Sequence, residues 1–252
     1  MAPRVAPCLA PRVAPCLAPA GAASSLDAWA PDVAAARAYA RRRPGVVSFS
    51  VRTPQRAWGD RATRGVPAAS TLKAILLVAY LRQRPVRGRP LRPAEKAMLR
   101  AMIRRSDNVA ATRVRDALGN RRLSRFARRA GMQRFRTHPV WGLSRVDASD
   151  LTTFMLGVDR LTPQRHRAYA LRLLETIVPS QRWGIARAQP PGWRLYFKGG
   201  WGSGTGAVDH QVALLTRGGQ RVAVAITTTD DGSHAAGKRT LRGVAKRLLA
   251  GL

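Results

Sequence analysis

Ser70 and Lys73 are the two residues of this sequence whose types and spacing best suit nucleophilic catalysis. They lie in PAASTLKAILLVAYLRQ (67–83), which has no helix breaker after its first residue, so both side chains should project from one helical face. A serine hydroxyl becomes a nucleophile when a base removes its proton, and a lysine with a lowered pKa can be that base. Free backbone N–H groups in the first helical turn favour the negative charge that develops. The pair therefore predicts an activated serine.

Two further motifs follow this pair along the chain. Ser106-Asp107-Asn108 lies at the joint between two predicted helices, and Lys198-Gly199-Gly200 lies at the end of a predicted strand. An SxxK pair, an SDN triplet and a Lys-Gly strand, in this order, are the motif set of serine β-lactamases and penicillin-binding proteins. Over residues 27–252 the sequence resembles the class A β-lactamase family, and the resemblance extends to the strings VPAASTLK, PPGWRLYFKGG, HQVALL, RVAVAIT and TLRGVAKRLL.

The use of lysine supports this interpretation. The chain has 45 Lys and Arg residues, of which five are lysines: Lys73, Lys96, Lys198, Lys238 and Lys246. An arginine cannot act as a base because its guanidinium stays protonated. In a chain that otherwise uses arginine, lysine is therefore kept at position 73, where deprotonation matters.

The resemblance implies a role for each motif residue. Ser70 would be the acylated nucleophile, Lys73 its base, and Ser106 the relay that passes a proton to the leaving nitrogen. Asn108 would orient Lys73 and the substrate amide. The implied activity is that of a serine hydrolase, which forms an acyl-enzyme with β-lactam or D-Ala-D-Ala-like amides and needs no metal or other cofactor.

The third motif would form the substrate-binding side of the site. Lys198 would raise the positive potential and attract a substrate carboxylate, and Gly200 would continue the binding strand. The backbone N–H groups of Ser70 and Trp201 would form the oxyanion hole. In the family a Thr or Ser follows the motif lysine and binds the substrate carboxylate, whereas this chain has Gly199; Ser203 or Thr205 could compensate.

A second departure concerns deacylation. Class A enzymes place a Glu after the SDN motif to activate the deacylating water, but the only Glu residues of this chain are Glu95 and Glu175. The segment MQRFRTHPVWGLSRVDASD (132–150) is Glu-free, and we expect Asp147 and Asp150 to be helix caps rather than bases. Slow deacylation is therefore expected. An alternative is a cell-envelope binding module that keeps the scaffold without turnover.

The order of predicted elements indicates an α/β fold, with an antiparallel sheet flanked by helices and an inserted all-helical lobe. The α/β lobe is expected to comprise residues 26–66 and 178–252, and the helical lobe residues 67–177. Helices are predicted at 32–45, 70–83, 93–104, 109–118, 121–130, 148–157, 163–177 and 236–250. Strands are predicted at 46–52, at RAWGD, and at 192–200, 207–216 and 221–229.

The first 25 residues have a different character from the rest of the chain. They contain a Pro-rich direct repeat with both cysteines, Cys8 and Cys16, so the folded body is expected to have no disulfide. The segment is expected to be disordered or to be a weak secretory signal, which favours an extracytoplasmic location over a cytoplasmic one. No stretch of 18 apolar residues predicts a membrane span.

The net charge of +32 does not by itself predict a nucleic-acid-binding protein. Arginine is spread over nearly every segment with few aromatics interleaved, which indicates a solvated basic surface, and a small-molecule substrate and a monomer are expected. A GxxxxGK string ends at Lys238 but lacks the following Ser or Thr of a phosphate-binding loop. The four histidines show no metal-ligand spacing and are expected at the surface or at caps.

Overall fold

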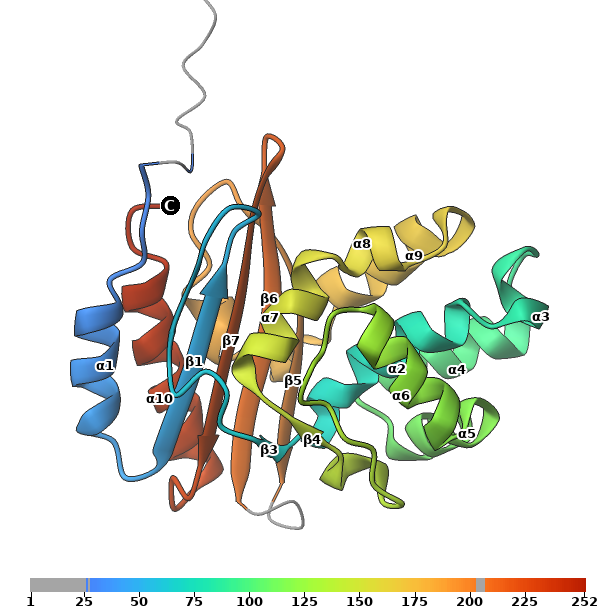
Figure 1. The fold of residues 1–252 in the computed structure, drawn as a ribbon, viewed down its shortest axis with the longest axis horizontal. Coiled ribbons are helices and arrows are strands. Elements are labelled where there is room, and N and C mark those ends of the chain that lie inside the picture. The colour runs from blue at the N-terminus through green and yellow to red at the C-terminus, as the bar shows by residue number, and fades with distance from the viewer. Residues whose placement is uncertain (1–25, 27, 203–206) are drawn as a thin grey trace, which may run out of the picture.

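The computed structural model describes residues 26, 28–202 and 207–252. The expectations for residues 1–25 and for Ser203 and Thr205 lie outside this part of the chain. A five-stranded antiparallel sheet forms its centre, with strand order β2-β1-β7-β6-β5 (Figure 1). The strands are β1 (Val46–Arg52), β2 (Ala57–Asp60), β5 (Arg194–Gly202), β6 (Val208–Arg217) and β7 (Gln220–Thr229).

The sheet joins strands from both ends of the described chain. β1 pairs with β7 in a register that places Phe49 opposite Ile226, and β5 pairs with β6 so that Trp201 lies opposite Asp209. The central strands β6 and β7 are apolar and buried over most of their length because helices cover both faces of the sheet. β5 lies at an edge of the sheet, beside β6.

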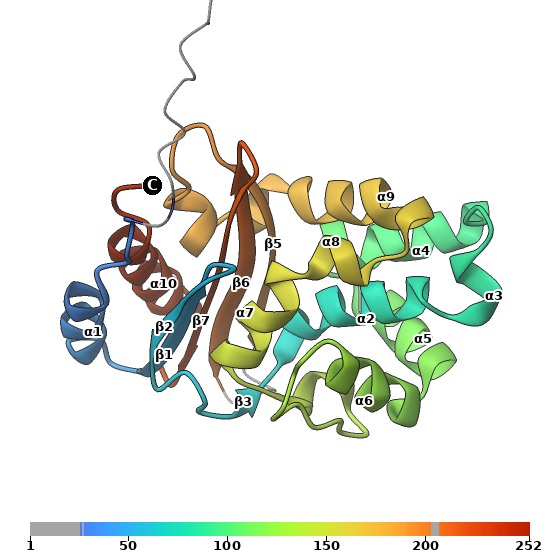
Figure 2. The same ribbon diagram turned by 45° about the horizontal axis from the view of Figure 1, so that its top comes forward.

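The helices on the two faces of the sheet come from different parts of the chain. α1 (Val33–Arg41) and α10 (His234–Leu248) pack together on one face, whereas α7 (Ala148–Leu156) packs on the other against β1, β6 and β7 (Figure 2). Their apolar residues recur at helical spacing and bury one side of each helix. The sheet is thus the middle layer of three.

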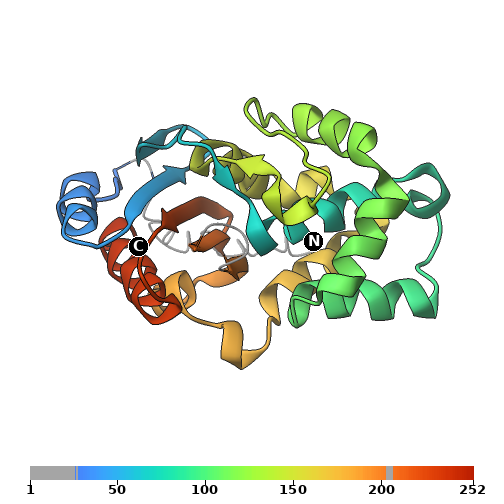
Figure 3. The same ribbon diagram turned by 90° about the horizontal axis from the view of Figure 1, so that it is seen from below.

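The remaining helices gather beside the sheet around α2 (Leu72–Leu81), in which every residue is buried (Figure 3). This burial requires neighbours all round α2, because a helix that is apolar on every side cannot face water. The helices beside it are α3 (Arg84–Arg87), α4 (Pro93–Arg104), α5 (Asn108–Leu118), α6 (Asn120–Arg129), α8 (Val158–Leu161) and α9 (Gln164–Glu175). The predicted fold class, an antiparallel sheet with flanking helices and a helical region inserted between its strands, is confirmed.

The structure also contains short elements that periodicity did not predict. These are α3, α8, the strands β3 (Val66–Pro67) and β4 (Arg145–Val146), and the 3-10 turns η1 (Ala69–Thr71), η2 (Trp141–Leu143), η3 (Pro179–Gln181) and η4 (Gly184–Arg187). The prediction that Ser70 lies in the first turn of an α-helix is wrong about the type of helix. Ser70 lies in the 3-10 turn η1, which leads directly into α2.

The prediction that all four histidines lie at the surface or at caps is wrong for two of them. His166 is 3% exposed and hydrogen-bonds the carbonyl oxygen of Val86, and His210 is fully buried. Both histidines contact backbone carbonyl oxygens inside the protein, which a spacing pattern cannot reveal. In the described part of the chain, none of the helices has both the length and the apolar character needed to cross a bilayer.

Candidate active site

Ser70 is held in a strained turn at the N-terminal end of α2. The preceding residue, Ala69, has a positive φ of 45°, a conformation that costs a non-glycine residue of order 1–3 kcal/mol and is concentrated at functional sites. Two hydrogen bonds support this turn: Thr71 Oγ1 donates to Ala68 O (2.6 Å), and Ala68 N donates to Ser144 O (2.7 Å). The turn therefore presents Ser70 in a fixed orientation at the edge of the helical region.

Lys73 lies one helical turn after Ser70 and is completely buried. Its Nζ donates to three acceptors: Ser106 O at 2.5 Å, Ser106 Oγ at 3.1 Å and Asn108 Oδ1 at 2.7 Å. Burial lowers the pKa of Lys73 to about 7, and the opposite charge of Asp107 limits this shift. The lowered pKa favours the uncharged amine, which is the form that can accept a proton.

Ser106 connects the two motif lysines. Its hydroxyl lies 3.1 Å from Lys73 Nζ and accepts a hydrogen bond from Lys198 Nζ at 3.0 Å. Ser106 has a φ of 59°, so a second strained residue lies at this site. Burial, followed by the charge of Lys73, holds the pKa of Lys198 well below its usual value. Two ammonium groups sharing one buried hydroxyl repel each other, which favours the loss of a proton from one of them.

Asn108 and Asp107 fix the SDN motif at the start of α5. Asp107 caps the helix, because its side chain accepts a hydrogen bond from Ala110 N at 2.7 Å. Asn108 is then the first helical residue and directs its amide oxygen toward Lys73. The structure therefore joins Lys73, Ser106, Asn108 and Lys198 through direct hydrogen bonds.

At Gly200 the edge strand β5 meets η1, the turn that carries the candidate nucleophile Ser70 and is called the nucleophile turn below. A Cβ atom at position 200 would lie 2.6 Å from Ser70 N and 2.8 Å from Thr71 N, so only glycine allows this approach. Alternate residues of a strand point to opposite faces. Positions 198 and 200 therefore face the helical region, whereas position 199 and the side chain of Trp201 belong to the face covered by α10.

Position 199, where the family has a Thr or Ser, lies close to the ring of Trp183. A Cβ atom on Gly199 would lie 3.2 and 3.3 Å from ring atoms of Trp183, which fills the space that a Thr or Ser would need. Trp183 makes an edge contact with Trp201, with ring centroids 5.8 Å apart. The region beside the third motif is therefore aromatic in this protein, and Gly199 belongs to that packing.

An indole lies over Lys73 in the segment where class A enzymes carry their Glu. Lys73 Nζ is 5.0 Å from the centroid of the Trp141 ring, a cation–π distance. Trp141 Nε1 donates to Thr112 Oγ1 at 3.1 Å, and Arg115 Nη1 donates to Pro139 O at 2.8 Å, so the segment is anchored on α5. Residues 137–144 contain no Asp or Glu.

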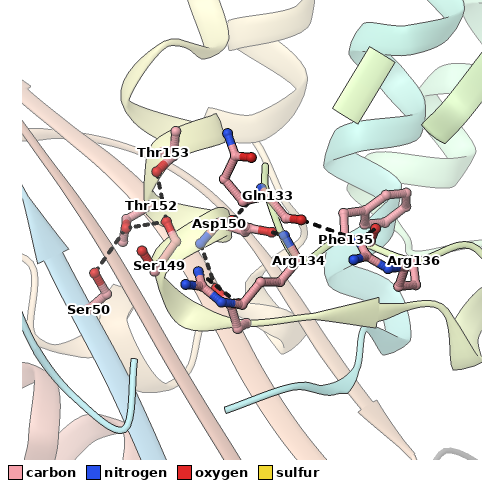
Figure 4. A network of polar contacts seen from close by, with 10 residues as sticks. Ser50, Gln133, Arg134, Phe135, Arg136, Ser149, Asp150, Thr152 and Thr153 are labelled. Atoms are coloured by element: carbon pink, nitrogen blue, oxygen red, sulfur yellow. Dashed lines mark hydrogen bonds and ion pairs between the residues drawn. The ribbon is translucent and has the colours of Figure 1, made fainter. Parts of the chain in front are cut away.

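Asp147 and Asp150 both accept hydrogen bonds from backbone N–H groups, and Figure 4 shows Asp150 with its partners. Asp147 caps α7 by accepting from Asp150 N at 2.7 Å, as predicted. Asp150 does not cap a helix, as had been predicted for it, but binds two backbone N–H groups. Its two carboxylate oxygens accept from Gln133 N (2.9 Å) and Arg134 N (2.7 Å), which ties the loop after α6 to α7. Backbone donors thus satisfy both oxygens of Asp150, whereas Asp147 Oδ2 is buried without a hydrogen-bond partner within the described residues.

His210 is a positioning residue that the sequence pattern missed. Its Nε2 lies 3.0 Å from Pro67 O, and its Nδ1 lies 2.8 Å from Asp209 O and 3.3 Å from Thr228 N. Burial lowers the pKa of His210 to about 4, so its ring is neutral and Nε2 can donate to the carbonyl. The ring thereby links the sheet to the residue three positions before Ser70. No spacing rule signals this contact, because β6 meets residue 67 only in the folded protein.

The part of the chain that the structure describes contains no group of three or more His, Cys, Asp or Glu side chains placed to hold a metal ion.

Comparisons with solved structures agree with this architecture. A β-lactamase from Sphaerobacter thermophilus is 21% identical with a TM-score of 0.73, over 86% of this chain and 95% of that chain. An ancestral class A β-lactamase is 18% identical with a TM-score of 0.73, over 88% of this chain and 100% of that chain. PBP-A is 18% identical with a TM-score of 0.72, over 86% of this chain and 93% of that chain. At these identities the likeness shows a shared fold.

The model of the beta-lactamase enzyme family matches residues 89–252, and the chain belongs to this family. The matched range includes the SDN motif and Lys198 but begins after Ser70 and Lys73. No curated protein sequence matches the chain.

Proposed function

We propose that this protein is a serine hydrolase that forms an acyl-enzyme at Ser70 with β-lactam or D-Ala-D-Ala-like amides and deacylates slowly. The observation that carries the proposal is the buried hydrogen-bonded chain from Lys73 through Ser106 to Lys198, one helical turn from Ser70. A lysine with a pKa of about 7 is matched to general-base work near neutral pH.

In the proposed acylation step, Lys73 Nζ takes the proton of Ser70 and the serine oxygen attacks the amide carbon. The backbone N–H groups of Ser70 and Trp201 stabilise the oxyanion, and the close approach of Gly200 to Ser70 N supports this pairing. Collapse of the tetrahedral intermediate breaks the C–N bond. The leaving nitrogen receives a proton from Ser106, which is replenished from Lys73, so the ester forms with no net loss of protons.

The second half of the reaction lacks an obvious base. Water must attack the ester, and the segment lying over Lys73 contributes Trp141 where the family has a Glu. Asp147 and Asp150 are engaged in the cap and loop described above. Lys73 remains the available proton acceptor, and we propose that it serves deacylation poorly. An extracytoplasmic location, where peptidoglycan-like substrates occur, is part of the same proposal.

Incubation with a reporter β-lactam is expected to give a burst of about one product per protein molecule, followed by slow turnover. Intact-mass measurement should show a persistent adduct that is absent in Ser70→Ala. Fast steady-state hydrolysis without a burst would show that deacylation has an efficient base. Absence of any adduct with β-lactams and with acyl-D-Ala-D-Ala mimics would instead support the binding module without turnover, which the glycine at position 199 also favours.

The pH dependence of acylation tests the role of Lys73. Since only the neutral amine can accept the serine proton, the rate should rise about tenfold per pH unit below 7 and level off above it. Asp107→Asn keeps an acceptor for Ala110 N but removes the charge that raises the pKa of Lys73. Its midpoint should therefore move to lower pH in stopped-flow acylation measurements. A midpoint that is the same in the parent and in Asp107→Asn would contradict this assignment.

A further inference from the structure

The indole of Trp141 lies between Lys73 and the protein surface. Lys73 is completely buried, and its Nζ is 5.0 Å from the centroid of the Trp141 ring. Trp141 itself is partly buried, whereas its neighbour Val140 is 58% exposed. The segment that contains η2 therefore forms an outer wall of the candidate active site, and the Trp141 ring is the inner side of that wall.

The Trp141 ring is held from two sides. Its Nε1 donates to Thr112 Oγ1 at 3.1 Å, which orients the ring on α5. The turn η2 also packs against η1, the nucleophile turn, and Ser144 O at its end accepts a hydrogen bond from Ala68 N at 2.7 Å. The indole is therefore anchored both on α5 and on the nucleophile turn.

The spacing between the ring and the amine leaves no room for water. A water molecule between them would lie about 2.9 Å from Nζ and about 3.5 Å from the ring atoms, so ring and amine would have to be more than about 6 Å apart. The observed distance of 5.0 Å is shorter. The three hydrogens that an ammonium can donate also have three acceptors, Ser106 O, Ser106 Oγ and Asn108 Oδ1. Water therefore has no place beside Lys73 on the side that the ring covers.

Exclusion of water affects the two halves of the proposed reaction differently. Acylation needs no water, because Lys73 lies one helical turn from Ser70 and takes the proton of the hydroxyl itself. Hydrolysis of the ester needs a water molecule that lies beside both the ester carbon and a base. A cover over Lys73 thus slows deacylation and spares acylation.

We infer that Trp141 keeps water away from Lys73 and thereby prolongs the life of the acyl-enzyme. The inference rests on the proposed function and gives slow deacylation a cause: Lys73 is a base that water does not reach. Trp141 acts through Lys73, so it is a positioning residue. Without the ring, water would attack the ester carbon while Lys73 Nζ takes its proton. The bond between that carbon and Ser70 Oγ then breaks, and the proton passes to Ser70 Oγ.

Trp141→Ala is expected to deacylate about 10- to 100-fold faster than the parent, up to the lower bound of a general-base contribution. Its acylation rate should stay close to that of the parent. Decay of the penicillin adduct, followed by intact mass after removal of excess penicillin, gives the deacylation rate, and stopped flow gives the acylation rate. The gain should grow as the pH rises through the pKa of Lys73, because only the neutral amine can activate water. A merely structural loss would lower both rates.

Trp141→Phe is the matched variant, since it keeps an aromatic face over Lys73 and loses only the hydrogen bond to Thr112 Oγ1. It should deacylate as slowly as the parent. Trp58→Ala removes another partly buried tryptophan, in β2, and should leave both rates unchanged. Deacylation of Trp141→Ala at the parent rate, or of Trp141→Phe as fast as Trp141→Ala, would overturn the inference. If Trp141→Ala does not fold, Trp141→Leu replaces it with the same expected direction.

A crystal structure of Trp141→Ala without ligand tests the cover independently of penicillins. An ordered water within hydrogen-bond distance of Lys73 Nζ is expected in the space that the indole leaves. If no penicillin acylates Ser70 but this water is present, the proposed function fails and the cover stands; without the water, both fail. If penicillins react and deacylation of Trp141→Ala is unchanged, the inference alone fails. Faster deacylation without a water at Lys73 would assign the water's base to another group and overturn the inference.

Discussion

Replacing Lys73 with Arg is expected to lower the rate of Ser70 acylation by at least about 10²-fold, the lower bound of a general-base contribution. The guanidinium keeps the positive charge and can donate hydrogen bonds, but it cannot lose a proton near neutral pH. Lys73 is fully buried among Ser106, Asn108 and Trp141, so the larger side chain also has to be accommodated. Stopped-flow acylation with a reporter β-lactam measures the loss.

Lys73→Met separates loss of the base from crowding. Methionine has an unbranched side chain without the amine. It leaves the three acceptors of Lys73 Nζ without this donor, so the melting temperature should fall by a few degrees. Its acylation rate should fall as far as that of Lys73→Arg. Lys246→Arg, on the final helix, should leave both rate and stability unchanged. Acylation of Lys73→Met at the parent rate would show that Lys73 is only a structural cation.

Gly200→Ala is expected to reduce acylation by about 10²-fold or more, because a displacement of about 1 Å is enough to cost that much. The new Cβ would lie 2.6 Å from Ser70 N and 2.8 Å from Thr71 N, and both atoms belong to the backbone of the nucleophile turn. Either β5 or this turn must move, which should also lower the free energy of unfolding by about 1–3 kcal/mol. Acylation kinetics and denaturant titration test the two effects.

Gly88→Ala is the matched control. Gly88 has a φ of −97°, and nothing lies within 4 Å of its Cβ position, so alanine fits without strain. Its acylation rate and stability should equal those of the parent. An acylation rate in Gly200→Ala equal to that of Gly88→Ala would mean that the contact between β5 and the nucleophile turn is not needed for the oxyanion hole.

Much of the fold follows from the local spacing of apolar residues, which does not depend on contacts with distant segments. The β1, β6 and β7 segments alternate or are continuously apolar, and helices such as α4 and α10 repeat apolar residues at helical spacing, so their types could be predicted. The short elements could not. β3 and β4 are two residues each and exist because Val66 pairs with Val146, a contact between segments 80 positions apart.

The sequence by itself determined which side chains are available for chemistry: an SxxK pair, an SDN triplet and a Lys-Gly strand. It also showed that Glu175 is the only Glu between the SDN triplet and the Lys-Gly strand. Residue type sets proton affinity and nucleophilicity, so these motifs indicated a serine acyl-enzyme without any coordinates. The spacing of Ser70 and Lys73 also placed them on one face, because helix geometry is local.

Only the tertiary structure decided what surrounds those groups. The pKa of Lys73 falls to about 7 because folding buries it, and Trp141 covers it although the two residues are far apart in the chain. Packing likewise brings the Trp183 ring close to position 199, and it leaves Asp231 Oδ2 buried without a hydrogen-bond partner within the described residues. Desolvation, ring stacking and unpaired polar atoms depend on neighbours from distant segments, so no local pattern could have predicted them.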